Sequence, residues 1–142
     1  MKLLFVCTGN TCRSPMAEAI AKKILSDRGI DAEVASAGIY AIPGQSLSEN
    51  AALALEKGFG IHDFSHVAMP LTGEMIREAD RIVAMTENHK TLIRQKFGES
   101  DKVVSMPHEI GDPFGGSLFQ YEACAGDIAL GIETLLNSGV IS

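Results

Sequence analysis

The chain has 142 residues, the usual size of one domain and enough to bury a sizeable core. Its 46% hydrophobic and 21% charged residues exclude a disordered protein, and no uncharged apolar run approaches the ~18 residues of a membrane span. The net charge of −6 disfavours nucleic acid as a partner. Because the amino-terminal apolar run LLFVC is too short for a secretion signal, we expect a cytoplasmic protein.

Short apolar runs alternate with segments of helical periodicity along the chain. In chain order, we expect a strand at 2–6, a helix at 15–28, a strand at 32–36, a helix at 46–57, a helix at 72–79, a strand at 81–85, a helix at 86–97, a strand at 102–106 and a helix at 118–136. Ser46 and Glu49 have the spacing of a capping box, and Gly58 is expected to end that helix. Thr72 and Thr86 are expected to cap the next two helices.

This alternation predicts a single α/β domain over residues 1–142, with a parallel sheet covered by helices on both faces. We expect a flavodoxin-like three-layer fold with about four strands in the order 2-1-3-4. In such folds, ligands bind at the carboxyl ends of the strands. The segment CTGNTCRSP at 7–15, here called the anion loop, follows the first strand and is therefore the candidate binding site.

The backbone of the anion loop predicts a phosphate site. Gly9 and Asn10 tolerate positive φ, so successive N–H groups can point inward. The helix that begins near Pro15 adds its positive end to the same hollow. Between the two ends of the loop, we expect the residues that surround the phosphate to be Thr8, Gly9, Asn10, Thr11, Cys12 and Ser14.

Cys7 and Arg13 bracket this loop in the pattern C-x5-R, which indicates nucleophilic chemistry at phosphorus. Arg13 can grip two phosphate oxygens at once. Together with the N–H groups and the helix end, it favours the thiolate form of Cys7, and the Ser14 hydroxyl can hydrogen-bond the sulfur. We expect in-line attack by Cys7, a thiophosphate intermediate, and no need for a metal or another cofactor.

A different function is suggested by T-G-N-T at 8–11, which resembles the phosphate loop of flavodoxins. The protein would then be an electron carrier that binds flavin mononucleotide. Flavin sites usually stack the ring between aromatic side chains, whereas this chain has no Trp and two Tyr. The flavin hypothesis also leaves the C-x5-R pattern without a role, so we favour a phosphatase.

The leaving group of such a reaction needs a proton, and a carboxylic acid should therefore lie across the hollow. Asp112, which Pro113 keeps extended in a glycine-rich loop, is the candidate acid. A plain Asp-Pro turn is the alternative for these two residues, and the C-x5-R pattern favours the acid.

With these residues in place, the chain resembles the low-molecular-weight protein tyrosine phosphatases along nearly its full length. The matching segments are CTGNTCRSPMAEA at the amino terminus, SAG at 36–38, SHVA at 65–68 and DPFGGS at 112–117. The resemblance implies that Cys7 is the nucleophile, Arg13 the phosphate clamp, and Asp112 the general acid and later base. It also implies that the strained loop is supported by hydrogen bonds from Asn10, Ser36 and His66. No motif includes His62, His89 or His108.

Two departures from the tyrosine-selective pattern bear on the substrate. Thr11 replaces a residue that is commonly Ile in that group, and Phe114 and Gly115 replace two tyrosines. Thr11 together with DPFGGS resembles the protein arginine phosphatase branch of the family, which implies phosphoarginine on proteins as the substrate. A Thr hydroxyl can bond a phosphoguanidinium that Ile would only desolvate, Asp112 can pair with it, and Phe114 can line the slot. Phosphotyrosine is the alternative substrate.

The three cysteines do not form a disulfide framework. The resemblance suggests that oxidation can trap a Cys7–Cys12 disulfide that protects Cys7, and the alternative is that Cys12 is a packed thiol. Cys124 is expected to face the core, and without a further cysteine pair we do not expect arsenate reduction. No second Cys or His pair has metal-ligand spacing, so we expect no metal site. We expect a monomer whose partners are phosphorylated proteins.

Overall fold

The structure is a computed structural model that describes residues 1–141, and its strands and helices follow the expected order. They are β1 (Lys2–Cys7), α1 (Arg13–Asp27), β2 (Glu33–Gly38), α2 (Glu49–Phe59), α3 (Gly73–Glu78), β3 (Arg81–Ala84), α4 (Glu87–Phe97), β4 (Val103–Ser105) and α5 (Leu118–Asn137). Every predicted strand and helix is present, with ends that differ by a few residues.

The strands form a parallel sheet in the order β2-β1-β3-β4, which confirms the predicted topology. The register pairs Cys7 of β1 with Gly38 of β2, and Val6 of β1 with Ala84 of β3. Parallel strands present their carboxyl ends at the same edge of the sheet. The anion loop, which follows β1, therefore lies at that edge between the ends of β2 and β3.

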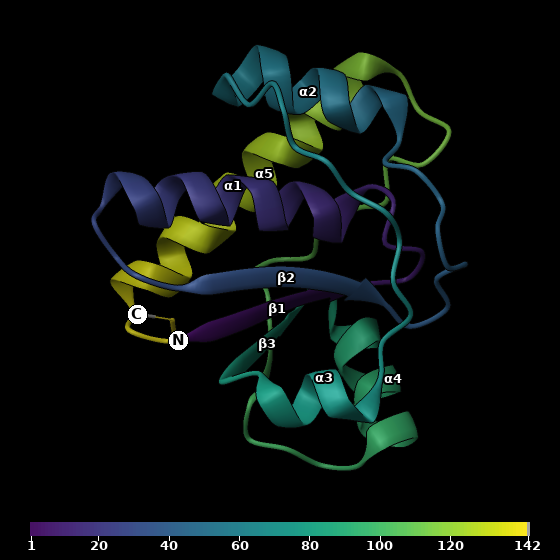
Figure 1. The fold of residues 1–142 in the computed structure, drawn as a ribbon, viewed down its shortest axis with the longest axis vertical. Coiled ribbons are helices and arrows are strands. Elements are labelled where there is room, and N and C mark those ends of the chain that lie inside the picture. Colours follow the sequence, from purple (N-terminus) through teal and green to yellow (C-terminus); the bar gives the residue numbers. More distant parts are fainter. Residues whose placement is uncertain (142) are drawn as a thin grey trace.

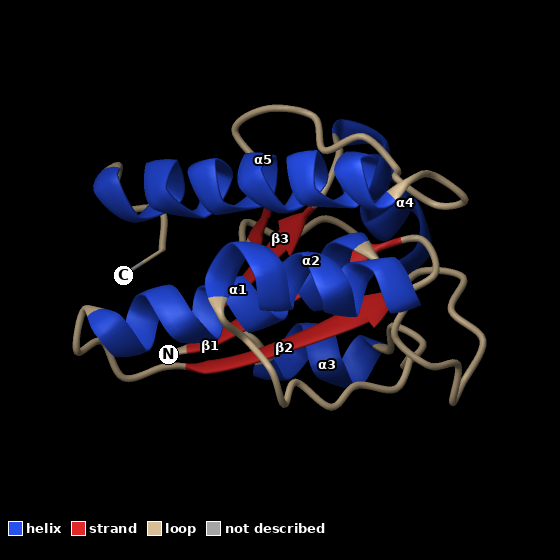
Figure 2. Cartoon of the chain, turned by 90° about the horizontal axis from the view of Figure 1, so that it is seen from above, coloured by secondary structure: helices blue, strands red, loops and turns tan. Residues whose placement is uncertain are grey.

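Helices cover both faces of the sheet, as expected for short apolar strands. Figure 1 shows α1, α2 and α5 on one face and α3 and α4 on the other, and Figure 2 shows α5 beside α1 and α2. Alternate residues of β1 serve the two faces: Leu3, Phe5 and Cys7 belong to the core under α1, α2 and α5. Leu4 and Val6 belong to the core under α3 and α4. The strand period of two thus directs Cys7 toward the α1 side.

The first helix begins earlier than the sequence suggested. We expected Pro15 to be its first residue, whereas α1 begins at Arg13 and Cys12 precedes it as the N-cap. The N–H groups of the first turn have no partner within a helix, so Pro15 is tolerated there. The earlier start gives the anion loop the free N–H groups of the first turn of α1.

The predicted capping box at Ser46 is wrong. Ser46 forms a β-bridge with Val67, which removes it from the helix, and α2 begins after Ser48. Gly58 lies inside α2, and Gly60, with a φ of 65°, ends it. The predicted caps of α3 and α4, Thr72 and Thr86, are confirmed. Each threonine hydroxyl accepts a hydrogen bond from a backbone N–H in the first turn of its helix.

The segment after β2 packs against the start of the anion loop. Ile39 and Tyr40 donate their backbone N–H groups to the carbonyl oxygens of Cys7 and Thr8, at 3.0 Å each. Gly38 makes this close approach feasible, because a Cβ at that position would lie 2.6 Å from the carbonyl oxygen of Thr8. The absence of a side chain at Gly38 therefore sets how closely β2 and the anion loop can approach.

Candidate active site

Asn10 gives the anion loop its curl. Its φ is 57°, and within residues 1–141 it is the one non-glycine residue with positive φ. Its buried amide donates to Ser14 Oγ at 2.8 Å and to Ser36 Oγ at 3.0 Å, and its Oδ1 accepts from the N–H of Met69 at 2.9 Å. His66 Nε2 donates to the Asn10 carbonyl oxygen at 2.8 Å. These four bonds hold a backbone conformation that is costly for a residue other than glycine.

Two more residues extend this support behind the loop. Ser36 lies in β2, and its hydroxyl donates to Glu18 Oε1 at 2.7 Å. Glu18, on α1, also pairs with Lys22 one helical turn later at 2.7 Å. The structure therefore brings Ser36 and His66 to the loop, as expected, and adds Glu18. Glu18 lies inside the matching segment CTGNTCRSPMAEA, but its residue type alone assigned it no role, because a carboxylate on a helix is usually solvated.

The sulfur of Cys7 lies at the base of the loop and receives two hydrogen bonds. The N–H of Asn10 donates to it at 3.3 Å, and Ser14 Oγ lies 2.9 Å from it. Ser14 Oγ accepts from the Asn10 amide, and its one proton has two acceptors in reach: the Cys7 sulfur at 2.9 Å and the Ala37 carbonyl oxygen at 3.4 Å, of which the sulfur is the nearer. Cys7 and Ser14 are both buried. Hydrogen bonds of this kind stabilise a negatively charged sulfur.

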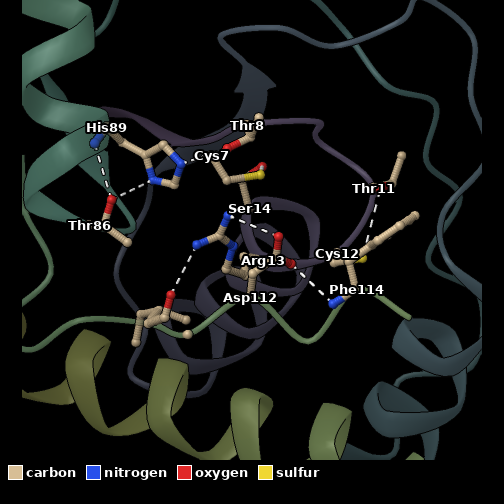
Figure 3. Close-up of polar contacts among 12 residues, drawn as sticks. Cys7, Thr8, Thr11, Cys12, Arg13, Ser14, Thr86, His89, Asp112 and Phe114 are labelled. Atoms are coloured by element: carbon tan, nitrogen blue, oxygen red, sulfur yellow. Dashed lines mark hydrogen bonds and ion pairs between the residues drawn. The ribbon is translucent and has the colours of Figure 1, made fainter. Parts of the chain in front are cut away.

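Arg13 and Asp112 face each other at the mouth of the loop (Figure 3). The Arg13 guanidinium is buried, donates to the carbonyl oxygen of Ile110 at 3.0 Å, and lies 3.7 Å from Asp112 Oδ2. The exposed Asp112 is anchored through its other oxygen, Oδ1, which accepts from the N–H of Phe114 at 3.1 Å. This arrangement holds one cation and one carboxylate beside the sulfur of Cys7.

The cavity that these residues enclose, here called the cup, has a volume of about 280 Å³. Residues 7–12 form its floor, Arg13 lies at its mouth, and the other residues that line it are Tyr40, Ile42, Gln45, Asp112 and Phe114. Tyr40 and Phe114 are 61% and 76% exposed, so the rim is partly aromatic. Thr11 lines the cup, whereas Ser14, Ser36 and His66 lie behind the floor.

His89, which no sequence motif identified, contacts the same loop from α4. It is buried, and its Nε2 lies 2.8 Å from Thr8 Oγ1 while its Nδ1 lies 3.0 Å from Thr86 Oγ1. Burial, together with the nearby positive charge of Arg13, lowers the pKa of His89 to about 4. His89 is therefore neutral near pH 7.

Cys12 also has a partner that the sequence did not reveal. Its sulfur lies 3.3 Å from the hydroxyl of Tyr121 on α5, and the Ser48 hydroxyl donates to the same Tyr121 oxygen at 3.1 Å. Burial and the contact with Cys12 raise the pKa of Tyr121. Burial likewise raises the pKa of Cys124, which faces the core as expected, to about 12. The raised pKa disfavours the thiolate form of Cys124, while Cys12 lines the same cavity as Cys7.

The remaining expectations concern metals and membranes. Within residues 1–141, no group of three or more His, Cys, Asp or Glu side chains could hold a metal ion. Over the same range, no helix combines the length and apolarity that crossing a membrane requires.

Comparisons with known proteins agree with this geometry. The sequence profile of the family described as low molecular weight phosphotyrosine protein phosphatase matches residues 2–139. A protein-arginine-phosphatase of Bacillus subtilis is 43% identical over 131 residues, which are 86% of this chain and 85% of the relative. The low molecular weight protein-tyrosine-phosphatase PtpB of Staphylococcus epidermidis is 38% identical over 128 residues, 86% of this chain and 87% of that protein.

Solved structures give the same result. The YwlE arginine phosphatase, in a cysteine-to-serine mutant with a phosphorylated active-site serine, has a TM-score of 0.92 and 38% identity, covering 97% of this chain and 95% of the other. A low molecular weight protein tyrosine phosphatase from T. tengcongensis has a TM-score of 0.92 and 37% identity, covering 97% and 99%. The profile match and these identities over most of the chain leave one conclusion. The chain belongs to the low molecular weight phosphotyrosine protein phosphatase family.

Proposed function

We propose that this cysteine-dependent phosphoprotein phosphatase hydrolyses phosphoarginine on proteins, with Cys7 as its nucleophile. The observation that carries the proposal is the cup itself. It holds a buried cysteine sulfur that accepts a hydrogen bond from the Asn10 N–H, with Arg13 and Asp112 at the mouth. Family membership and the C-x5-R loop together disfavour the flavin-carrier hypothesis.

The reaction follows from these positions in two steps. The Cys7 thiolate attacks phosphorus, the bond from phosphorus to the leaving atom breaks, and Asp112 donates a proton to that atom. Asp112 then removes a proton from water, which attacks the phosphocysteine and releases phosphate and the thiolate. Arg13 and the N–H groups stabilise the three equatorial oxygens in both steps. The phosphorylated serine in the related structure supports a covalent intermediate at this position.

Thr11 supports phosphoarginine as the substrate. Its side chain lines the cup, and its contact with Cys12 Sγ is long, at 3.7 Å, so the hydroxyl can bond a substrate instead. A phosphoguanidinium is polar on every edge, and a hydroxyl satisfies one of its N–H groups, which an apolar side chain would leave unpaired. In its ionised form, before it takes up the proton that it donates, Asp112 can pair with the same group. The relative with 43% identity is named for arginine phosphatase activity.

Phosphotyrosine is the second candidate, and the rim of the cup favours it. Tyr40, Ile42 and Phe114 are exposed and line the opening, where they could hold a phenyl ring. Other relatives are named as tyrosine phosphatases.

The deciding experiment compares two peptides that differ only in phosphoarginine or phosphotyrosine. We expect wild type to have the higher kcat/KM on phosphoarginine. Thr11→Val, which removes the hydroxyl and keeps the shape, should lower that value about tenfold while leaving phosphotyrosine hydrolysis within twofold. Thr11→Ser, which keeps the hydroxyl, is the matched control. Wild-type preference for phosphotyrosine, or an unchanged ratio in Thr11→Val, would overturn the assignment of phosphoarginine.

The nucleophile has its own test. Cys7→Ser should lose all hydrolysis of p-nitrophenyl phosphate, whichever amino acid carries phosphate in the natural substrate. Retained turnover in Cys7→Ser would remove the covalent mechanism.

We propose further that the protein acts as a monomer in the cytoplasm. Its three cysteines are free within residues 1–141, which is usual in a reducing compartment. Light scattering of the purified protein measures the oligomeric state, and a stable dimer would contradict this proposal.

A further inference from the structure

A row of three hydrogen-bonded side chains connects α4 to the floor of the cup. It runs from Thr86 Oγ1 to His89 Nδ1 at 3.0 Å, and from His89 Nε2 to Thr8 Oγ1 at 2.8 Å (Figure 3). His89 is 3% exposed, so solvent competes little for either ring nitrogen. Thr8 belongs to the anion loop, next to Cys7, and lines the cup.

The direction of each bond in this row follows from the cap of α4. Thr86 Oγ1 accepts from the backbone N–H of His89 at 3.1 Å, so its own proton is free to be donated. Within residues 1–141, the acceptor that this proton meets is His89 Nδ1. A neutral imidazole that accepts at Nδ1 carries its proton on Nε2, which then donates to Thr8 Oγ1. The low pKa of His89, about 4, keeps the ring in this neutral form.

The same argument orients the Thr8 hydroxyl. Since Thr8 Oγ1 accepts from His89, its remaining proton points to another acceptor. The Cys7 sulfur already has partners in the Ser14 hydroxyl and the Asn10 N–H. A phosphoryl oxygen held in the cup is the acceptor that a substrate would supply.

We propose that His89 is a positioning residue that turns the Thr8 hydroxyl proton toward the phosphoryl group. Thr8 then adds one side-chain donor to the N–H groups and Arg13. This inference rests on the proposed phosphatase function. It differs from a purely structural role for His89, because it requires the N–H at Nε2 rather than the bulk of the ring.

The test is a double-mutant cycle with inorganic phosphate as the probe. Its Ki against p-nitrophenyl phosphate hydrolysis is measured for wild type, Thr8→Val, His89→Leu and the double variant. Each single variant should raise the Ki about fivefold. Thr8→Val removes the hydroxyl that bonds the phosphoryl oxygen, and His89→Leu removes the N–H that orients that hydroxyl. The Ki of the double variant should also be about fivefold above the wild-type Ki, because His89 acts through Thr8 and has no effect of its own once Thr8 is replaced.

A conservative variant separates donation from packing. The amide of His89→Gln can donate to Thr8, so His89→Gln should bind phosphate about threefold more tightly than His89→Leu. Three outcomes would each overturn the proposal. They are a Ki about 25-fold above wild type in the double variant, an unchanged Ki in His89→Leu, and equal Ki values for the Gln and Leu variants.

Folding and function are controlled separately. If His89→Leu does not fold, His89→Asn replaces it in the cycle. The asparagine side chain is one carbon shorter than that of glutamine, so its amide does not reach Thr8. Wild-type protein without phosphatase activity would refute the proposed function. Active wild type, with His89→Leu at the wild-type Ki, would refute this inference alone.

Discussion

The buried histidine beside the cup should make the stability of this protein fall in mild acid. The pKa of His89 is lowered from 6.5 to about 4 in the folded chain, mainly by burial and also by Arg13. As the pH falls below 6.5, the unfolded chain therefore takes up a proton at this position before the folded chain does. Stability from this source is fully present above pH 6.5 and is lost progressively toward pH 4.

The magnitude follows from the two pKa values. Each pH unit of difference corresponds to about 1.4 kcal/mol, so the interval from 6.5 to about 4 corresponds to about 3 kcal/mol. Between pH 7 and pH 5, the loss in the free energy of unfolding should be about 2 kcal/mol. That is a large part of the roughly 5–15 kcal/mol that stabilises a typical domain.

Urea unfolding of wild type and His89→Gln at pH 7 and pH 5 measures this loss. Glutamine does not titrate, and all other ionisable groups are common to both proteins. Wild type should therefore lose about 2 kcal/mol more than His89→Gln over this range. His62→Gln, at an exposed histidine, is the matched control and should behave as wild type. Equal losses in wild type and His89→Gln would refute the argument from burial.

Three further predictions concern the acid, the second cysteine and the glycine behind the loop. Asp112→Asn should lower kcat on phosphopeptides by roughly 10²–10⁴ while the Ki of phosphate changes little, and a near-normal kcat would exclude Asp112 as the general acid. After peroxide and then reductant, Cys12→Ser should recover less activity than wild type, whereas equal recovery would exclude a protective Cys7–Cys12 disulfide. Gly38→Ala should lower the free energy of unfolding by about 1–3 kcal/mol in urea, because its Cβ would lie 2.6 Å from the Thr8 carbonyl oxygen; an unchanged midpoint would contradict this packing.

The fold was predictable because its signals are local and agree with one another. Apolar strands alternate with amphipathic helices, and Thr72 and Thr86 mark helix starts where the structure has them. The capping box at Ser46 failed for a tertiary reason. Its backbone pairs with Val67, about twenty residues later, and no local pattern announces such a bridge.

The site likewise contains residues that the sequence indicated and residues that only the folded chain brings together. Cys7, Arg13 and Ser14 lie within eight residues, so a single curled loop brings them together, and their spacing was informative. His89 and Tyr121 come from different helices and contact the loop only in the folded chain, and Glu18 acts on it indirectly, through Ser36. A lone histidine, tyrosine or glutamate has many ordinary roles, and its residue type alone does not indicate a partner.

The sequence by itself determined the class of chemistry, the parallel sheet and the edge at which the loop lies. These depend on short-range spacing and on hydrophobic periodicity. The tertiary structure alone decided which buried partners hold the loop. The contact of His89 with Thr8 and the low pKa of His89 arise from burial among residues far apart in the chain. The net charge of −6 belongs to the whole chain, while the buried Arg13 that lines the cup makes that one site receptive to an anion.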